Sequence, residues 1–277
     1  MGHQMDGLRE SDTMKKNNVF NLAYQCLSES VLDKKLVMSV DHANQIISDN
    51  AQFDKYTFKN ILPGRPGKPV LINPRDLPRR NVQTVEGKAA MLHAFAHIEF
   101  NAINLAWDLI CRFQDMPQEF YRDWASVAAE ETQHFILLQN RLRQMGYDYG
   151  DFPAHDGLWQ IAEDTKHDVM LRLGVVPRIL EARGLDVTPD LINRFSEIRD
   201  NETVSILSVI LEEEIGHVKL GTKWFRYLCD ENDLDSDTIF KHICDEFMPS
   251  NKTNRINQQA RLQAGFSHTE LQHIISN

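Results

Sequence analysis

The spacing of apolar residues predicts that most of this chain is helical. Near the N-terminus, apolar residues recur every three or four positions from Val19 to Leu27 and again from Leu36 to Ile47, which predicts two amphipathic helices. From Thr84 onward the same period continues, and strand-like alternation is nearly absent. We therefore expect an all-α protein.

Proline and glycine residues divide the part after Thr84 into four main helices. Pro117 suits the first turn of a helix, and Gly146 suits the left-handed conformation that ends one. Thr188-Pro189 resembles an N-cap followed by a first-turn proline, so 189–199 is expected to form a short extra helix. The predicted main helices cover residues 86–114, 117–145, 157–183 and 202–229.

A connector with five prolines, LPGRPGKPVLINPRDLPRR, precedes these helices. Because proline fixes φ and lacks a backbone donor, the connector should be extended. It is also basic, which suggests either a strap whose charges face solvent or a surface for a phosphate-bearing partner. Its basic residues, with one just before it, are Lys59, Arg65, Lys68, Arg75, Arg79 and Arg80.

The predicted organisation has four parts: an N-terminal helical extension (1–60), the connector (61–83), a four-helix bundle (84–230) and a C-terminal helical tail (231–277). With 277 residues, of which 42% are hydrophobic, the chain can bury one large core. The net charge of −10 argues against broad binding to nucleic acids or anionic membranes.

The sequence shows no targeting or disulfide pattern. No apolar run is as long as a membrane span, and the segment from Met1 to Lys16 is polar, so we expect a cytoplasmic protein with no membrane partner. The four cysteines lack CxxC spacing and lie in apolar helical segments, which indicates reduced core thiols without a catalytic role. They are Cys26, Cys111, Cys229 and Cys244.

A repeated pattern of glutamate and histidine carries the candidate chemistry. Glu99 precedes a Glu-x-x-His segment by 32 residues, and Glu181 precedes a second such segment by 33. Residues three apart share a helix face, so each Glu and His can reach one metal. This is the ligand set of ferritin-like di-iron and di-manganese proteins. The predicted ligands of a dinuclear site are Glu99, Glu131, His134, Glu181, Glu214 and His217.

The predicted helix lengths support this site in the first pair of helices. Glu99 lies 15 residues before Gln114, and Glu131 lies 14 residues after Pro117. At 1.5 Å per residue these are about 22 Å and about 21 Å, so antiparallel neighbours would place both glutamates at one height. In the second pair the heights disagree, because Glu181 lies only three residues before Gly184.

The surroundings of the predicted ligands also favour a metal site. Glu99, Glu131 and Glu214 lie within apolar stripes, and buried carboxylates require compensation, which two divalent cations would provide for four carboxylates. Before Glu181, Gly174 and Pro177 predict a kink. Iron is the expected metal, and manganese stays an alternative because it accepts the same ligands.

Other glutamates and histidines in and near these patterns are not predicted to be metal ligands. Both motifs read Glu-Glu-x-x-His, but pairing at i and i+3 keeps the ligands within the stripes, which leaves Glu130, Glu212 and Glu213 facing solvent or supporting the ligands. A third match, Glu270 with His273, begins with Ser267 as a capping box and is rejected as a site.

Six further polar residues are not predicted to be metal ligands. His93 and His97 are expected to pack rather than ligate, since both point away from the Glu99 face. His155-Asp156 is interpreted as a cap. Arg178 and Arg183 flank Glu181, and two roles are open for them: pairing with acidic neighbours, or binding an anionic part of a substrate.

Several segments, EGKAAMLHAFAHIEFNAINLAWD, EETQHF, VPRILEARGLDVTP and EEEIGHVKLGTKWF, together resemble a bacterial ferritin-like family of unassigned function. The resemblance covers about residues 60–230. That family is similar to the tRNA hydroxylase of isopentenylated adenosine, whose di-iron centre resembles this ligand set. The resemblance implies the same six ligands and oxygen-dependent hydroxylation, and it does not transfer the substrate.

Three functional hypotheses follow. The first is a di-iron oxidoreductase that uses dioxygen and an electron donor to hydroxylate or desaturate a small-molecule or nucleotide-containing substrate. The second is a peroxide-scavenging or iron-handling ferritin relative, although the N-terminal extension would obstruct a ferritin shell. The third is a metal-stabilised binding protein without catalysis. The oligomeric state is open, with a homodimer as one alternative.

Overall fold

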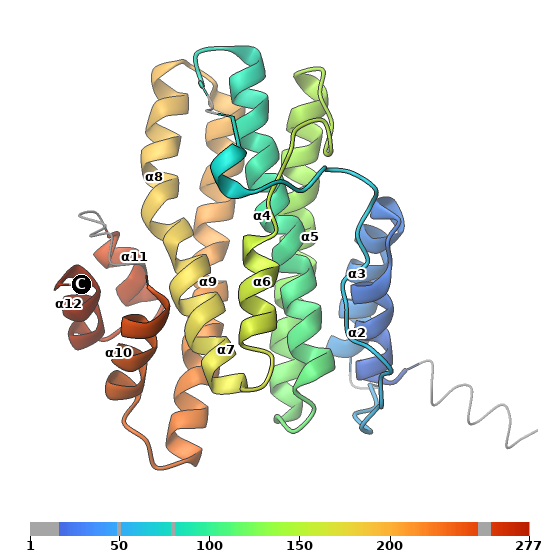
Figure 1. The fold of residues 1–277 in the computed structure, drawn as a ribbon, viewed down its shortest axis with the longest axis vertical. Helices are drawn as coiled ribbons and strands as arrows, with labels where there is room; N and C mark the ends of the chain where they lie inside the picture. The colour runs from blue at the N-terminus through green and yellow to red at the C-terminus, as the bar shows by residue number, and fades with distance from the viewer. Residues whose placement is uncertain (1–16, 49–50, 79–80, 249–255, 277) are drawn as a thin grey trace, which may run out of the picture. The chain divides into compact units, whose positions relative to one another are not determined.

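The computed structural model describes residues 17–48, 51–78, 81–248 and 256–276. The all-α prediction is confirmed: within these ranges there is no strand, and only two isolated bridges occur. The chain divides into two compact units, and Figure 1 shows the helices of both. Unit 1 consists of Met1–Pro78 and Ala89–His155, and unit 2 consists of Arg79–Lys88 and Asp156–Asn277.

The two predicted N-terminal helices are present in unit 1 as α2 (Val19–Ser28) and α3 (Leu32–Ile47). Asn18 caps α2, because its side-chain oxygen accepts a hydrogen bond from the Asn21 amide at 3.0 Å. The apolar positions of α2 are buried, and α3 packs against both α2 and α5.

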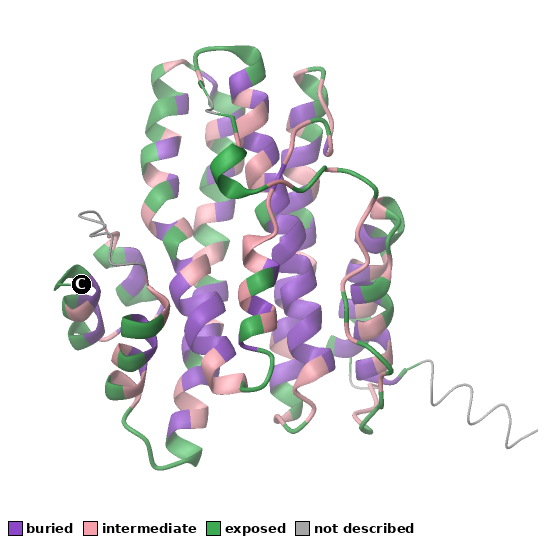
Figure 2. Cartoon of the chain, in the orientation of Figure 1, coloured by how far each residue is buried: buried purple, intermediate pink, exposed green. Residues whose placement is uncertain are grey.

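The next two helices, α4 (Val85–Arg112) and α5 (Gln118–Gln144), agree with the predicted ranges to within two residues. Gly146 has a φ of +84°, the left-handed conformation expected after a helix end. Phe100 of α4 and Phe135 of α5 lie with their ring centroids 6.2 Å apart. Figure 2 shows the long run of buried positions along α5.

The connector is largely extended, as predicted, with one short 3₁₀ turn, η1 (Pro74–Asp76). It is fastened to unit 1 at two places: the Gly64 amide donates to the Leu27 carbonyl at 2.7 Å, and the Ile72 amide donates to the Ala154 carbonyl at 2.9 Å. The connector therefore lies along the surface of unit 1 as an extended strap. Lys59, Lys68 and Arg75 are exposed, whereas Arg79 and Arg80 lie outside the described residues.

The predicted third helix, 157–183, is wrong in its bounds. The structure divides it into α6 (Gly157–Asp164), α7 (Val169–Val175) and the π-helical turn η2 (Val176–Glu181), and the chain then continues as α8 (Ala182–Glu197). Asp168 explains the first break, because its carboxylate accepts from the Met170 and Leu171 amides and caps α7. The predicted break at 184–189 and the separate helix 189–199 are not present.

Pro189 therefore lies inside α8, where a proline normally leaves the carbonyl four residues earlier without its helical partner. Here that carbonyl belongs to Leu185, and it accepts a hydrogen bond from the side-chain amide of Asn257 at 3.2 Å. A residue 72 positions away thus replaces the missing donor, which explains why the helix continues through the proline.

The turn between the last two long helices consequently falls near Asp200. Arg199 has a φ of +57°, and Asp200 caps α9 (Asn201–Glu231) by accepting from the Thr203 amide. Glu181 now lies 16 residues before the end of α8, about 24 Å, and Glu214 lies 13 residues after the start of α9, about 20 Å. The heights differ by less than one helical turn, so the mismatch came from misplacing the turn.

The irregularity predicted near Gly174 and Pro177 is confirmed as the turn η2. Pro177 packs on α9 where that helix carries Gly221, and a Cβ at Gly221 would lie 2.4 Å from the Pro177 Cβ. Glycine at this position is therefore needed for close packing. Isolated π-turns within helices commonly occur at functional sites.

The C-terminal tail is helical: α10 (Ser236–Phe247), α11 (Gln258–Gln263) and α12 (His268–Ser276). The capping box that opens α12 is confirmed, since the Glu270 amide donates to Ser267 Oγ at 3.0 Å and Glu270 Oε2 accepts from the Ser267 amide at 2.8 Å. All four cysteines are free and buried. No helix among the described residues is sufficiently long and apolar to cross a membrane.

Unit 1 contains a fully buried lysine. The Lys35 ammonium group donates to the Cys26 carbonyl, to the Leu27 carbonyl and, at 2.6 Å, to Asn104 Oδ1. Burial lowers the pKa of Lys35 to about 7. An unfolded lysine keeps its proton up to about pH 10.4. Between these pH values the unfolded state binds more protons, so this group makes the protein more stable as pH rises.

Replacing Lys35 by methionine should remove this pH dependence. From pH 7 to pH 9, the free energy of unfolding should rise more steeply in the wild type than in Lys35→Met, by on the order of 1 kcal/mol per pH unit. Urea unfolding at a series of pH values measures the difference. Lys34→Met, at the exposed neighbouring position, is the control and should follow the wild type. Parallel curves for Lys35→Met and the wild type would contradict the burial argument.

The Leu185 carbonyl provides a second test. Asn257→Ala should cost about 1–2 kcal/mol of stability, because it removes the donor to Leu185 and the cap of α11. In a Pro189→Ala background the amide of residue 189 can donate to Leu185 instead, so the cost should fall by about 0.5–1 kcal/mol. A double-mutant cycle by chemical denaturation measures this coupling, and strict additivity would rule out the replacement of one donor by the other.

Candidate metal centre

In unit 1 three predicted ligands lie close together. Glu99 projects from α4, and Glu131 and His134 project from adjacent turns of α5. Nδ1 of His134 lies 3.4 Å from Glu131 Oε2 and 3.8 Å from Glu99 Oε2, and all three side chains are buried. The pattern of one Glu followed by Glu-x-x-His therefore places its three side chains at one point of this unit.

In unit 2 the second Glu-x-x-His pair has the same local geometry. Nδ1 of His217 lies 3.7 Å from Glu214 Oε1, with His217 buried and Glu214 half-buried on α9. Glu181 is the last residue of η2 and is half-buried. Measured along the helices from the turn near Asp200, Glu181 and Glu214 lie at distances that differ by less than one helical turn.

Burial governs the electrostatics of the unit 1 cluster. Burial, together with the charge of Glu131, raises the pKa of Glu99 well above its ordinary value. Burial alone would lower the pKa of His134, but its interactions with Glu131 and Glu99 raise that pKa to about 11. Glu99 Oε2 is buried and accepts no hydrogen bond. These carboxylates lie where a proton or a cation must compensate their charge.

The side chains in both units suit a metal ion. Glu131 and His134 in unit 1, and Glu214 and His217 in unit 2, are glutamate and histidine groups that could hold one. Carboxylate oxygens combined with imidazole nitrogens fit divalent transition metals such as Fe²⁺ and Mn²⁺. The buried Glu and His cluster is therefore a candidate metal site, and its donors leave the choice of metal open.

Comparison with known proteins places this chain in a family. A family model described as "Protein of unknown function (DUF455)" matches residues 24–272. The chain belongs to the DUF455 family. A Haemophilus influenzae protein named "Uncharacterized protein" is 46% identical over 216 residues, which cover 76% of this chain and 75% of that protein. No solved structure matches the chain.

Two histidines of the DUF455 chain pack as predicted. Nδ1 of His97 lies 2.8 Å from the Tyr149 hydroxyl, and its Nε2 lies 3.1 Å from the His155 carbonyl. Burial lowers the pKa of His97 to about 4, so the ring is neutral. His93 stacks on Tyr149 and accepts from the Gly150 amide. Both rings fix the loop after α5.

Among the glutamates beside the motifs, Glu212 and Glu213 are exposed, as predicted. Glu130 is half-buried and accepts a hydrogen bond from Ser126 at 3.0 Å. Asp156 occupies the N-cap position of α6, as predicted, although its side chain forms no capping hydrogen bond with the helix. His273 lies 2.7 Å from Asp245, away from the rejected motif partner Glu270.

The sequence pattern missed the partner of Arg178. This arginine is fully buried, and its Nη2 donates to Glu270 Oε1 at 2.7 Å. Its guanidinium also lies over the rings of Phe225, Phe240 and Phe266. Of the two roles left open for Arg178, pairing with an acidic residue is the one observed. The capping box at Glu270 was the only local signal, and it gave no indication of a partner 92 residues away.

Paired substitutions can test the ligand assignment in this DUF455 protein. The wild type, purified without a metal-chelating column, should hold about two metal ions per chain. Glu131→Ala and Glu214→Ala should lose them, while the neighbouring Glu130→Ala and Glu213→Ala should retain them. Elemental analysis of the five proteins measures this. A native protein without metal would refute the site, and loss in the control variants instead would favour the i and i+4 pairing.

Proposed function

We propose that this chain is a dinuclear-iron carboxylate oxidoreductase with a ferritin-like four-helix bundle. In this proposal α4 and α5 supply one half of the ligands, and the η2–α8 helix and α9 supply the other half. The observation that carries it is the repetition of one arrangement, a Glu followed by Glu-x-x-His on the next long helix, with Glu and His side chains in contact in each unit. The proposed ligands are Glu99, Glu131, His134, Glu181, Glu214 and His217.

The donor set supports a redox metal over a purely structural one. Structural zinc sites are usually closed by four cysteine or histidine ligands, whereas this set is rich in carboxylates and contains no cysteine. Two ferrous ions bound here would activate dioxygen, using two electrons from an external donor, for hydroxylation or desaturation of an organic substrate. In a hydroxylation, one oxygen atom enters the substrate and the other leaves as water with two protons.

The chain's own residues would prepare this chemistry. Burial of Glu99, Glu131 and His134 excludes bulk water and fixes the ligand side chains between packed helices. Glu130, the adjacent glutamate on α5, accepts a hydrogen bond from Ser126. The resemblance to the tRNA hydroxylase supports the reaction class, and the substrate, whether a small molecule or a nucleotide-containing one, is not assigned.

Oxygen consumption tests the reaction class. Protein loaded with iron should consume dioxygen repeatedly when a chemical reductant is supplied, because the centre is oxidised and reduced again in each cycle. Glu131→Ala and Glu214→Ala should lose at least about 100-fold of this rate, whereas Glu130→Ala and Glu213→Ala should keep it. An oxygen electrode measures the rate.

Other outcomes would identify a different function. A single round of iron oxidation, together with shell-sized particles on a sizing column, would indicate iron storage. Bound metal without any oxygen consumption would indicate a metal-stabilised binding protein. Bound manganese in place of iron would revise the metal while leaving the ligand assignment intact.

A further inference from the structure

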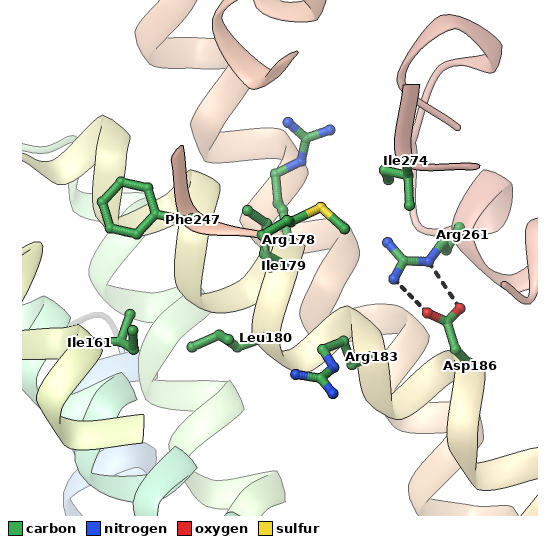
Figure 3. Close-up of a pocket in the computed structure, with 10 residues that line it drawn as sticks. Ile161, Arg178, Ile179, Leu180, Arg183, Asp186, Phe247, Arg261 and Ile274 are labelled. Carbon is green, nitrogen blue, oxygen red and sulfur yellow. Dashed lines mark hydrogen bonds and ion pairs between the residues drawn. The ribbon is translucent and has the colours of Figure 1, made fainter. Parts of the chain in front are cut away.

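Unit 2 contains a cavity of about 220 Å³ beside the η2 turn. Its wall is formed by η2 and the start of α8, by α6, and by the end of α10 with α11 and α12, as Figure 3 shows. Six apolar side chains make up most of this wall: Ile161, Ile179, Leu180, Phe247, Met248 and Ile274. The other lining residues are charged, so the cavity combines an apolar body with a polar edge.

The charged side chains at this edge differ in whether they have a partner of opposite charge. Asp186 forms two hydrogen bonds with Arg261, at 3.0 Å and 2.6 Å, which are drawn as dashed lines in Figure 3. Arg178 is compensated by Glu270, with 2.7 Å between Nη2 and Oε1. Because these two pairs neutralise themselves, they contribute little net charge to the cavity.

Arg183 is the remaining charged residue of the wall. Its guanidinium lies between Leu180 and the Asp186–Arg261 pair, at the cavity edge (Figure 3). Among the described residues it forms no ion pair or hydrogen bond with an acidic side chain, and it is exposed. Of the two roles left open for Arg183 by its sequence, pairing with an acidic neighbour is therefore not the one observed.

We propose that this cavity binds a small organic anion, with Arg183 holding the anionic group and the apolar wall enclosing the rest of the molecule. A guanidinium presents paired N–H donors that match a carboxylate or a phosphate. Apolar walls with a few placed polar groups are the usual composition of small-molecule sites. A guanidinium without an acidic partner at the cavity edge attracts an anion more strongly than a neutral molecule of the same size.

The volume limits the size of the ligand. A volume of about 220 Å³ lies below the usual range of small-molecule pockets, about 300–1,000 Å³, so a short aliphatic or aromatic body is the suitable size of ligand. The site lies wholly within unit 2 and does not rest on the proposed metal centre. Its failure and the failure of that centre are therefore separate results.

Hexanoate is a suitable probe. Hexanol is the neutral control with the same alkyl chain, and acetate is the control that keeps the carboxylate but has almost no alkyl chain. Ligand-detected NMR titration of the full chain should show saturable binding of hexanoate, with hexanol and acetate each at least about tenfold weaker. Hexyl phosphate in a parallel titration distinguishes a phosphate from a carboxylate as the preferred anionic group.

Three variants test the lining residues. Arg183→Gln should weaken hexanoate binding at least about tenfold while leaving hexanol binding unchanged. Arg194→Gln removes the same charge from an exposed position of the same helix and should bind hexanoate like the wild type. Ile161→Phe, which fills part of the cavity from α6, should weaken hexanoate and hexanol together. Circular dichroism of each variant verifies the fold.

Three results would overturn the proposal. Equal affinity for hexanoate and hexanol would mean that Arg183 does not select an anion. Equal weakening by Arg183→Gln and Arg194→Gln would mean that only the overall charge matters. No saturable hexanoate binding by the folded wild type would mean that the cavity is not a ligand site. Metal content measured on the same samples should stay at the wild-type level in all three variants.

Discussion

The cost of burying carboxylates is the constraint on which the rest of this structure depends. Glu99 and Glu131 lie in the interior of unit 1 beside a buried imidazole, and such groups are stable only when a proton or a cation compensates them. Apolar packing around them raises that cost. A bound cation would therefore stabilise these helices more than a surface ion pair would. A single Glu-x-x-His match can arise by chance, so the repetition of the pattern is more informative than either motif alone.

The parts of the fold that depend on local sequence could be predicted. Apolar periodicity located α2 to α5 and α9 to within a few residues, and the connector's prolines predicted its extended course. The proximity of Glu and His within each motif could also be predicted, because residues three apart on a helix share a face. Local rules predicted the wrong end for the helix that carries Glu181, since Thr188-Pro189 has every local feature of a helix start.

That error has a tertiary cause. Pro189 would leave the Leu185 carbonyl without a partner, and Asn257 supplies one from a distant part of the chain. The Arg178–Glu270 and Asp186–Arg261 pairs also join residues far apart in the sequence, and no local sequence pattern predicts them. The cavity beside η2 was likewise beyond prediction, because its wall comes from helices that only the folded unit brings together.

These remote contacts give the C-terminal helices a role in the geometry of unit 2. Asn257, Arg261 and Glu270 all fasten α11 and α12 to the η2–α8 segment, and they act on the residues just before and after Glu181. A π-turn is less regular than an α-helix and needs such external contacts to hold one conformation. The height of Glu181 relative to Glu214 thus depends on a continuous α8, and the continuity of α8 depends on a side chain contributed by the tail.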